Sequence, residues 1–345
     1  MRHKNEKIKR FIIENIPAHP RDISLFAAQK LKINRRTVID YLQELVKSGE
    51  ISLSGKTRAR EYFLGINLTK MWEIPIDQKT EENEIWRTRM LPELSGVADN
   101  VRRICQHGFT EMLNNVIDHS EADHVQLQLI RKQGLIWMRI HDNGIGIFER
   151  LRRAFGLSPE EALLELRKGK LTSSPDKHSG EGIFFTSKMF DTFYIQSRGY
   201  GFMDGSKLDA KLETKLAEDP WEKGTEVDLL ITENSQRKVE EVFNEFTGTG
   251  DFGFVRTRIP LSEAKGKDED LLSRSQARRV MARTELFKEV DLDFTGIERI
   301  GQAFADEIFR VFKNEHPEVK VSVLNAGAEI AKMISWVEKG GGASV

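Results

Sequence analysis

Helical and strand-like patterns follow one another in the first 65 residues of the chain. The apolar positions of EKIKRFIIENI recur near helical spacing, and Pro17 ends this first helix. Two more helices are predicted for DISLFAAQKL and NRRTVIDYLQELVKSG; in the second, Asn34 is placed to cap the start and Gly49 to end it. The strand-like segments EISLSG and TRAREYFL enclose a turn at residues 54–56, which predicts a β-hairpin.

This order of three helices and a hairpin over residues 1–65 resembles a winged helix-turn-helix domain. The segment holds 14 Lys and Arg against 7 Asp and Glu, a net charge of +7, whereas the whole chain carries −1. A basic segment favours an anionic partner, and DNA is the one that this resemblance implies. DNA contacts are expected from the third helix and the wing, through Arg35, Arg36, Thr37, Lys56, Arg58 and Arg60. The alternative is a solvated basic face on a module used for dimerisation.

Residues 66–99 have a weaker pattern. Their polar stretch DQKTEENE is typical of a linker, whereas Trp72, Trp86, Met90 and Leu91 are expected to be buried. The segment is therefore predicted to connect two domains and to pack on one of them.

Four short motifs follow in a fixed order between residues 100 and 233. The helix FTEMLNNVIDHS places Glu111, Asn115 and Asp118 on its polar side, opposite an apolar face. A predicted hairpin ends at Asp142 in DNGIGI, HSGEGIFF leads into another helix, and KGTEVDLLI is a buried strand. Glycines at a helix start allow backbone N–H groups to bind phosphate, and a carboxylate at a strand end can accept from an amino group.

Together these motifs resemble the GHKL ATPases, the group that contains gyrase, Hsp90, histidine kinases and MutL. The resemblance implies an α/β sandwich over about residues 100–260 that binds ATP and Mg²⁺. It makes Glu111 the general base and Asn115 the Mg²⁺ ligand, and Asp142 the acceptor for the adenine amino group, supported by Thr225. The other residues that it assigns to the nucleotide are Gly144 and Gly146 on the adenine side and Gly180 and Gly182 on the phosphate side. Asp118 is also expected at the nucleotide, without a specific role.

Between the two glycine motifs, about residues 148–179, this group carries a lid over ATP, where Lys170 and Thr172 could reach phosphate. The helix EMLNNVIDHS is also similar to that of anti-sigma serine/threonine kinases. A kinase of the partner-switching type and a regulator that senses nucleotide without turnover therefore stay open as alternatives.

The C-terminal residues follow a β-α-β-α pattern. LFKEVDLDF and EVKVSVL are strand-like, and each precedes an apolar helical repeat, which predicts a small parallel sheet. Residues 284–345 resemble a STAS-like domain, the class that contains anti-sigma-factor antagonists, and imply a surface for a protein partner. Arg299 stands where the phosphorylatable members carry serine, so no phosphate is expected there.

A connecting helix is predicted over residues 261–283. Its arginines, Arg274, Arg278 and Arg279, are expected either to face solvent or to reach the γ-phosphate of ATP.

Composition agrees with this multidomain α/β organisation. The chain of 345 residues is 39% hydrophobic and 31% charged, as expected for two or three globular domains. No apolar run approaches the roughly 18 residues of a membrane span, and no signal-peptide core is found, which favours a cytoplasmic protein.

The complete arrangement resembles a bacterial family of winged-helix, GHKL and STAS-like regulators. The function expected is a Mg·ATP switch coupled to DNA binding or partner docking, with a homodimer also compatible.

Overall fold

The structure is a computed structural model that describes residues 2–54, 60–65, 67–77, 79–132, 134–171, 180–205, 223–248, 251–265 and 270–339. The chain forms two compact units, each of which contains two segments of the sequence. The first unit comprises Met1–Arg150 and Thr186–Val239, and the second comprises Leu151–Phe185 and Glu240–Val345. Within the described residues, no helix combines the length and the apolar character that crossing a membrane requires.

The first unit begins with three helices and a two-stranded hairpin. The helices are α1 (Arg2–Asn15), α2 (Ile23–Leu31) and α3 (Arg35–Ser48), and the hairpin strands are β1 (Ile51–Ser54) and β2 (Glu61–Leu64). Asn34 caps α3 by accepting from the N–H of Arg36 at 2.8 Å, and Gly49 ends the helix with φ of 77°. The three predicted helices and the first strand are confirmed; the second strand begins at Glu61, and residues 55–59 of the predicted turn and strand lie outside the described residues.

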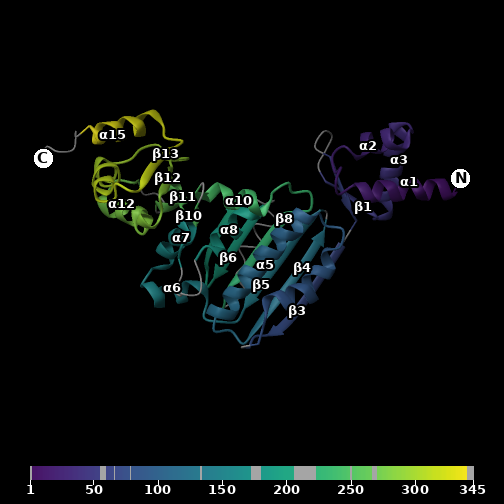
Figure 1. The fold of residues 1–345 in the computed structure, drawn as a ribbon, viewed down its shortest axis with the longest axis horizontal. Coiled ribbons are helices and arrows are strands. Elements are labelled where there is room, and N and C mark those ends of the chain that lie inside the picture. The colour runs from purple at the N-terminus through teal and green to yellow at the C-terminus, as the bar shows by residue number, and fades with distance from the viewer. Residues whose placement is uncertain are drawn as a thin grey trace. The chain divides into compact units, whose positions relative to one another are not determined.

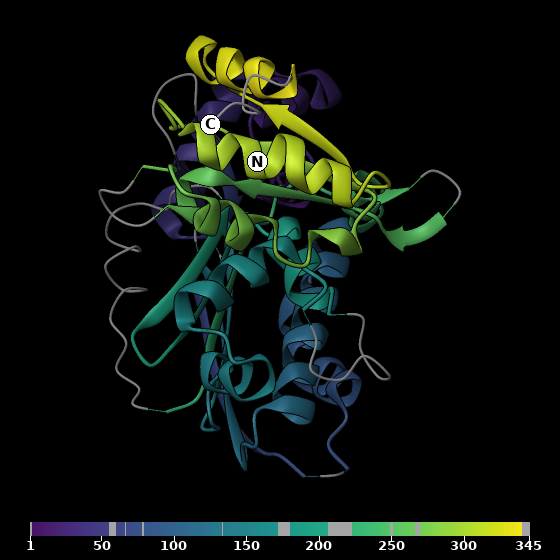
Figure 2. The same cartoon turned by 90° about the vertical axis from the view of Figure 1, so that its left-hand side faces the viewer.

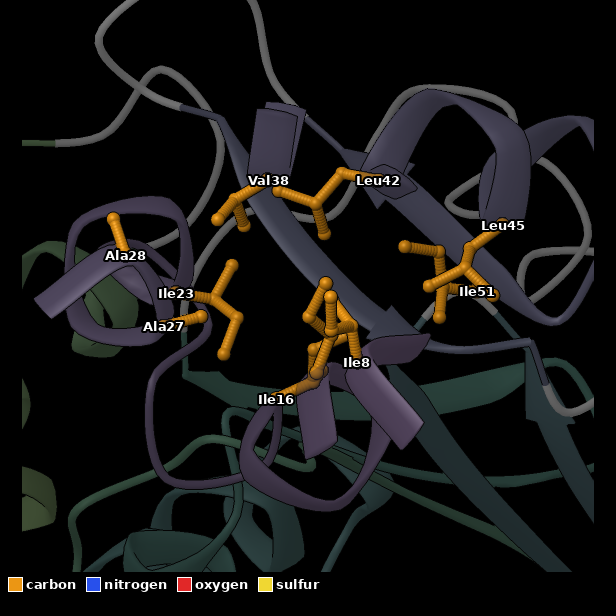
Figure 3. Packing of buried hydrophobic residues seen from close by; sticks show 10 residues of the cluster. Ile8, Ile16, Ile23, Ala27, Ala28, Val38, Leu42, Leu45 and Ile51 are labelled. Carbon is orange, nitrogen blue, oxygen red and sulfur yellow. The ribbon is translucent and has the colours of Figure 1, made fainter. Parts of the chain in front are cut away.

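One apolar cluster holds these elements together, and Figure 3 shows its side chains pointing toward one another. It is formed by Ile8, Ile12, Ile16, Ile23, Ala27, Ala28, Val38, Leu42, Leu45 and Ile51. Since burial of one aliphatic side chain contributes about 1.5–3 kcal/mol, this cluster can support a small domain.

A six-stranded sheet forms the body of the first unit (Figure 1). Its order is β3-β4-β5-β8-β6-β7, and every neighbouring pair is antiparallel. The bounds are β3 Asn67–Pro75, β4 His124–Lys132, β5 Leu135–Asp142, β6 Thr192–Ser197, β7 Tyr200–Gly205 and β8 Glu226–Thr232.

The edge strand β3 differs from the prediction of a linker over residues 66–99. It pairs with β4 at every position from Asn67 to Pro75. Its charged residues Lys70 and Glu73 interrupt the apolar pattern, so the sequence gives no clear strand signal here. After β3 come α4 (Glu82–Ile85), the π-helix η2 (Trp86–Met90) and the 3₁₀ helix η3 (Leu91–Leu94). Trp86 and Met90 are buried as predicted, Trp72 is half-buried, and Leu91 is 37% exposed instead.

The long helix α5 (Asp99–His119) lies along one face of this sheet (Figure 1). Its predicted apolar face, Phe109, Met112, Leu113 and Val116, is buried. A Cβ on Gly108 would lie 2.3 Å from the Phe190 ring, so this glycine allows close packing of α5 on the chain that follows α8 (Gly182–Met189). Three helices cross between the units along the chain: α6 (Ile147–Phe155), α8 and α10 (Val239–Phe246).

The second unit contains a parallel three-stranded sheet. Its order is β11 (Arg256–Pro260), β12 (Glu289–Asp293) and β13 (Lys320–Leu324). The predicted boundaries place β11 in the ATPase-like domain, but its residues pair with β12. This parallel pairing joins segments about 30 residues apart, and local periodicity gives no signal for such a partner.

Short helices surround this small sheet. They are α7 (Pro159–Lys168), α11 (Leu261–Ala264), α12 (Arg274–Met281), η4 (Thr284–Leu286), α13 (Gln302–Asp306), η5 (Glu307–Phe312), α14 (Lys313–Glu315) and α15 (Ala328–Glu338). Figure 2 shows α15 and the continuous helix of residues 302–315 beside the strands. A short hairpin, β9 (Thr247–Gly248) with β10 (Asp251–Phe254), brings Phe254 into a cluster with Phe184 and Phe287.

Candidate nucleotide site

The loop that follows β5 is held against two other segments by close backbone contacts. A Cβ on Gly144 would lie 2.0 Å from the carbonyl oxygen of Ser120, and one on Gly224 would lie 1.7 Å from that of Asp142. The N–H of Asp142 donates to the carbonyl of Thr225 at 3.0 Å. Only glycine fits at these two positions, so backbone packing by itself already requires both residues.

Side-chain hydroxyls complete this arrangement of loops. The N–H of Ile147 donates to Oγ1 of Thr225 at 2.9 Å, and Oγ of Ser197 donates to the carbonyl of Gly224 at 2.5 Å. Gly146 has φ of 84°, and a Cβ there would lie 2.3 Å from Oγ of Ser197. The ends of β5 and β6 and the start of β8 therefore meet in one place, which we call the Asp142 cradle: residues 142–147, Ser197 and residues 224–225.

Asp142 is the ionisable group of the cradle. Its residue is 2% exposed, and its Oδ1 accepts from the N–H of Gly144 at 2.8 Å. Burial raises the pKa of this carboxyl to about 6, while hydrogen bonds from the backbone of Gly144 and Thr225 act in the opposite direction. Above that pH the group is a hydrogen-bond acceptor in a fixed position, which suits an amino group of a ligand.

Helix α5 ends next to this cradle. The carbonyl of Ser120, directly after α5, accepts from the N–H of Ile145 at 2.9 Å, so the helix end and the cradle are joined. Glu111 and Asn115 are half-buried on the helix, and Asp118 is exposed. Among the described residues, the amide of Asn115 has no hydrogen-bond partner. An amide oxygen is a ligand type that Mg²⁺ accepts, so Asn115 fits the role that the sequence predicts.

The predicted phosphate-side glycines belong to the second unit and are described with it. Gly180 has φ of 74°, and a Cβ there would lie 2.7 Å from the carbonyl carbon of Leu171. Gly182 is the first residue of α8, where helix N–H groups lack intrahelical partners.

Three of the residues predicted to bind ligands lie outside the described residues. They are Thr172 of the predicted lid and Lys56 and Arg58 of the predicted wing.

Lys170, predicted to reach phosphate, is engaged within the second unit. Its Nζ donates to the carbonyl of Leu286 at 2.8 Å and lies 4.7 Å from the centre of the Phe287 ring and 5.6 Å from that of Phe254. Burial lowers the pKa of this ammonium. The structure therefore shows Lys170 bound to groups of its own unit.

A buried ion pair in the same region has no counterpart among the sequence-based expectations. Lys168 is 1% exposed, and its Nζ donates to Oε1 of Glu165 at 2.7 Å and to the carbonyl of Ala282 at 2.7 Å. Burial lowers the pKa of Lys168, and Glu165 opposes that shift. The carbonyl of Lys168 also accepts from Oγ1 of Thr257 in β11 at 2.8 Å. These bonds attach α7, which lies in the predicted lid, to the C-terminal part of the same unit.

The arginines of α12 are ion-paired or hydrogen-bonded. Arg274 lies 3.3 Å from Asp306, and Arg278 lies 2.6 Å from Glu307. Arg279 donates to the carbonyl of Ala264 at 3.1 Å. Arg274 and Arg278 remain 57% and 70% exposed, so these ion pairs lie at the surface.

The residues predicted to contact DNA lie at the start of α3 and beside the hairpin. Arg35, Arg36, Thr37 and Arg60 are exposed. Arg35 donates from Nε to Oγ of Ser24 at 3.1 Å, which ties the start of α3 to α2, and Arg36 lies 3.5 Å from Asp40. Exposed cations at a helix start are suitable for phosphate contacts.

Comparison with protein families identifies part of the second unit. Residues 276–331 match the family described as STAS-like domain of unknown function (DUF4325). The chain carries a C-terminal STAS-like domain. This match begins within α12 and ends within α15, so it covers β12 and β13. The comparison with curated proteins gives no match.

The turn that follows β12 in this STAS-like domain is well defined. The N–H and Oγ1 of Thr295 both donate to Oδ1 of Asp293, at 3.0 and 2.7 Å, and Gly296 has φ of 76°. A tight turn is therefore present at this threonine. Arg299, where no phosphate is expected from the sequence, pairs with Asp270 at 2.5 Å.

Proposed function

We propose that the chain is an ATP-binding and ATP-hydrolysing switch of the GHKL type, coupled to DNA binding and to partner docking by its STAS-like domain. The Asp142 cradle is the observation that carries this proposal. It combines a buried carboxylate with two loop backbones in contact, and it is joined at Ser120 to the end of the helix that carries Glu111 and Asn115.

Five residues of the cradle have a role in this proposal. Asp142 accepts from the adenine amino group, and Thr225 holds the loop around it through Ile147. Gly144 and Gly146 keep the backbone close to the base. Guanine carries a carbonyl oxygen where adenine has its 6-amino group, and this acceptor would oppose the carboxylate, so the site should prefer adenine to guanine nucleotides.

For hydrolysis, Glu111 takes the proton of the attacking water. The water oxygen bonds to the γ-phosphorus, the bond to the bridging oxygen breaks, and ADP and phosphate leave. Asn115 would hold Mg²⁺, which would offset the negative charge on the phosphates. A positioned general base contributes about 10²- to 10⁴-fold to such a rate.

The N-terminal helices and hairpin supply the DNA-binding part of the proposal. Their basic surface includes exposed Arg35 and Arg36 at the start of α3. The STAS-like domain supplies a protein-docking surface, which is compatible with its family match.

A serine/threonine kinase of the partner-switching type is the second candidate, because the chain itself contains a STAS-like domain. Incubation of the full chain with γ-labelled ATP and Mg²⁺ separates the two. Free labelled phosphate without labelled protein supports the ATPase. Stoichiometric label on Thr295 that is lost in Thr295→Ala would favour the kinase, and binding without release of phosphate would favour a nucleotide sensor.

A further inference from the structure

Strand β3 forms one border of the six-stranded sheet (Figure 1). It pairs with β4 over nine consecutive residues without a bulge. Among the described residues, no strand pairs with its outer edge. A long regular edge strand presents unpaired N–H and C=O groups, and proteins usually shorten, bend or cover such an edge.

The centre of β3 carries an exposed apolar side chain. Met71 is 67% exposed, the highest exposure among the large hydrophobic residues of the described chain. The two charges on the strand have partners in the same chain, since Lys70 lies 3.4 Å from Glu93 and Glu73 lies 3.8 Å from His124. The edge is therefore neutral, and its centre is apolar.

We propose that β3 pairs antiparallel with β3 of a second copy of this chain, about a two-fold axis at Met71. The two sheets then form one continuous sheet across a homodimer. This assembly uses no residue of the Asp142 cradle or of α3.

The register follows from the faces of the sheet. Lys70 and Trp72 pair with the buried Leu129 and Leu127, and Met71 pairs with Gln128, so alternate residues of β3 lie on opposite faces. A two-fold axis perpendicular to the sheet keeps each face continuous, which requires that opposed residues lie on the same face. Axes through residues 70, 71, 72 or 73 satisfy this condition.

Charge then selects among these axes. An axis at Lys70 opposes two lysines, and one at Glu73 opposes two glutamates, both of which destabilise a strand pair. An axis at Trp72 sets Met71 against Glu73. An axis at Met71 instead opposes the two methionines and places Lys70 opposite Trp72, where a cation–π contact can form. This self-complementarity is why a second copy, and not a foreign strand, is the partner.

Disulfide trapping of the full-length chain tests this register. Opposed Cα atoms in an antiparallel pair lie about 4.5–5.5 Å apart, within the range of a disulfide. The native Cys105 is fully buried, so it gives little background. Met71→Cys should form a covalent dimer under mild oxidation, whereas Leu25→Cys, an exposed apolar position on α2 (47% exposed), should not. Absence of the dimer in Met71→Cys, or equal yields from both variants, would overturn the proposal.

Sedimentation equilibrium tests the interface without cysteine. Met71→Asp places two carboxylates opposite each other at the axis and should raise the dimer dissociation constant at least tenfold, while Met71→Leu should keep it. Thermal unfolding of Met71→Asp should match the wild-type chain under conditions where both are monomeric, because the side chain is exposed. A wild-type chain that is monomeric throughout, or a Met71→Asp variant that dimerises equally well, contradicts the proposal.

Discussion

The N–H of Ile147 donates to Oγ1 of Thr225 at 2.9 Å, although 78 residues separate them in the sequence. This bond joins the loop after β5 to the residue before β8, and it fixes the loop that begins at Asp142. In the proposed function, the same bond keeps the adenine-binding carboxylate in place while the nucleotide exchanges.

ATP affinity should depend on pH through Asp142. Its pKa is raised to about 6 by burial, so the carboxylate predominates above that pH and the neutral acid below it. The neutral acid presents an O–H toward an amino donor, and affinity should therefore fall as pH decreases from about 8 to about 5, through the pKa of this group. Titration calorimetry with Mg·ATP across this range measures the effect. An affinity that is constant over this range would remove Asp142 from the adenine contact.

The effect of Asp142 on stability has the opposite sign. The folded chain holds the Asp142 proton more tightly than the unfolded chain, in which the pKa of this carboxyl is near 3.8. The contribution of this group to the free energy of unfolding therefore decreases as pH rises from about 4 through 6 and is constant above. This dependence should disappear in Asp142→Asn, and denaturant unfolding at a series of pH values on both sides of the folded-state pKa provides the comparison.

Glu111→Gln should reduce hydrolysis by about 10²- to 10⁴-fold and leave ATP binding within about threefold of wild type. The base is needed only for the chemical step, and Glu111 is half-buried on the polar side of α5. Phosphate release under saturating ATP is the measurement. Gln106→Ala, an exposed position on the same helix, is the control and should turn over normally. Wild-type turnover in Glu111→Gln would mean that another group acts as the base.

Lys168→Met should destabilise the second unit by about 3–5 kcal/mol, because it leaves the buried carboxylate of Glu165 without its lysine. Arg283, 3.5 Å from Glu165, compensates only in part. The double variant Lys168→Met/Glu165→Leu should recover most of this stability, since it removes both buried charges. Urea unfolding of the three chains gives the comparison. Equal stability of Lys168→Met and wild type would show that the buried pair does not anchor α7.

DNA binding by the full chain should weaken in the double variant Arg35→Ala/Arg36→Ala. For each phosphate that the variant no longer neutralises, the slope of log K against log salt should become shallower by about 0.9. The charge-matched control is Lys320→Ala/Lys332→Ala, which removes two exposed lysines of the STAS-like domain. Fluorescence anisotropy on several duplexes measures both. If the two double variants bind equally weakly, the start of α3 is not where DNA binds.

Local elements could be predicted from the sequence because their signals are local. The apolar face of α5 and the cap at Asn34 follow from helical spacing and from one side chain near the helix start. The edge strand β3 could not be predicted in this way, since Lys70 and Glu73 interrupt its apolar pattern. The pairing of β11 with β12 was equally hidden, because a parallel pair depends on residues distant in the sequence.

The motifs were enough to name the residues of the candidate site. They did not show why glycine is required at particular positions of it. Gly224 is required by the carbonyl of Asp142, a residue far from it in the sequence. The buried pair of Lys168 and Glu165 also has no sequence signal, because charged residues three apart on a helix are usually exposed. Tertiary packing determines which charged residues are buried, and the local sequence does not reveal that packing.

Binding of ATP to Asp142→Asn tests the central claim most directly. Asparagine keeps an oxygen for the N–H of Gly144 but presents an amide N–H₂ where the carboxylate accepts, so it opposes the adenine amino group with a second donor. At a pH about two units above the Asp142 pKa, calorimetry should show one Mg·ATP per wild-type chain and an affinity at least tenfold lower in the variant, about 1.4 kcal/mol. No binding by the wild-type chain, or equal affinity in a folded variant, would contradict the proposed nucleotide site.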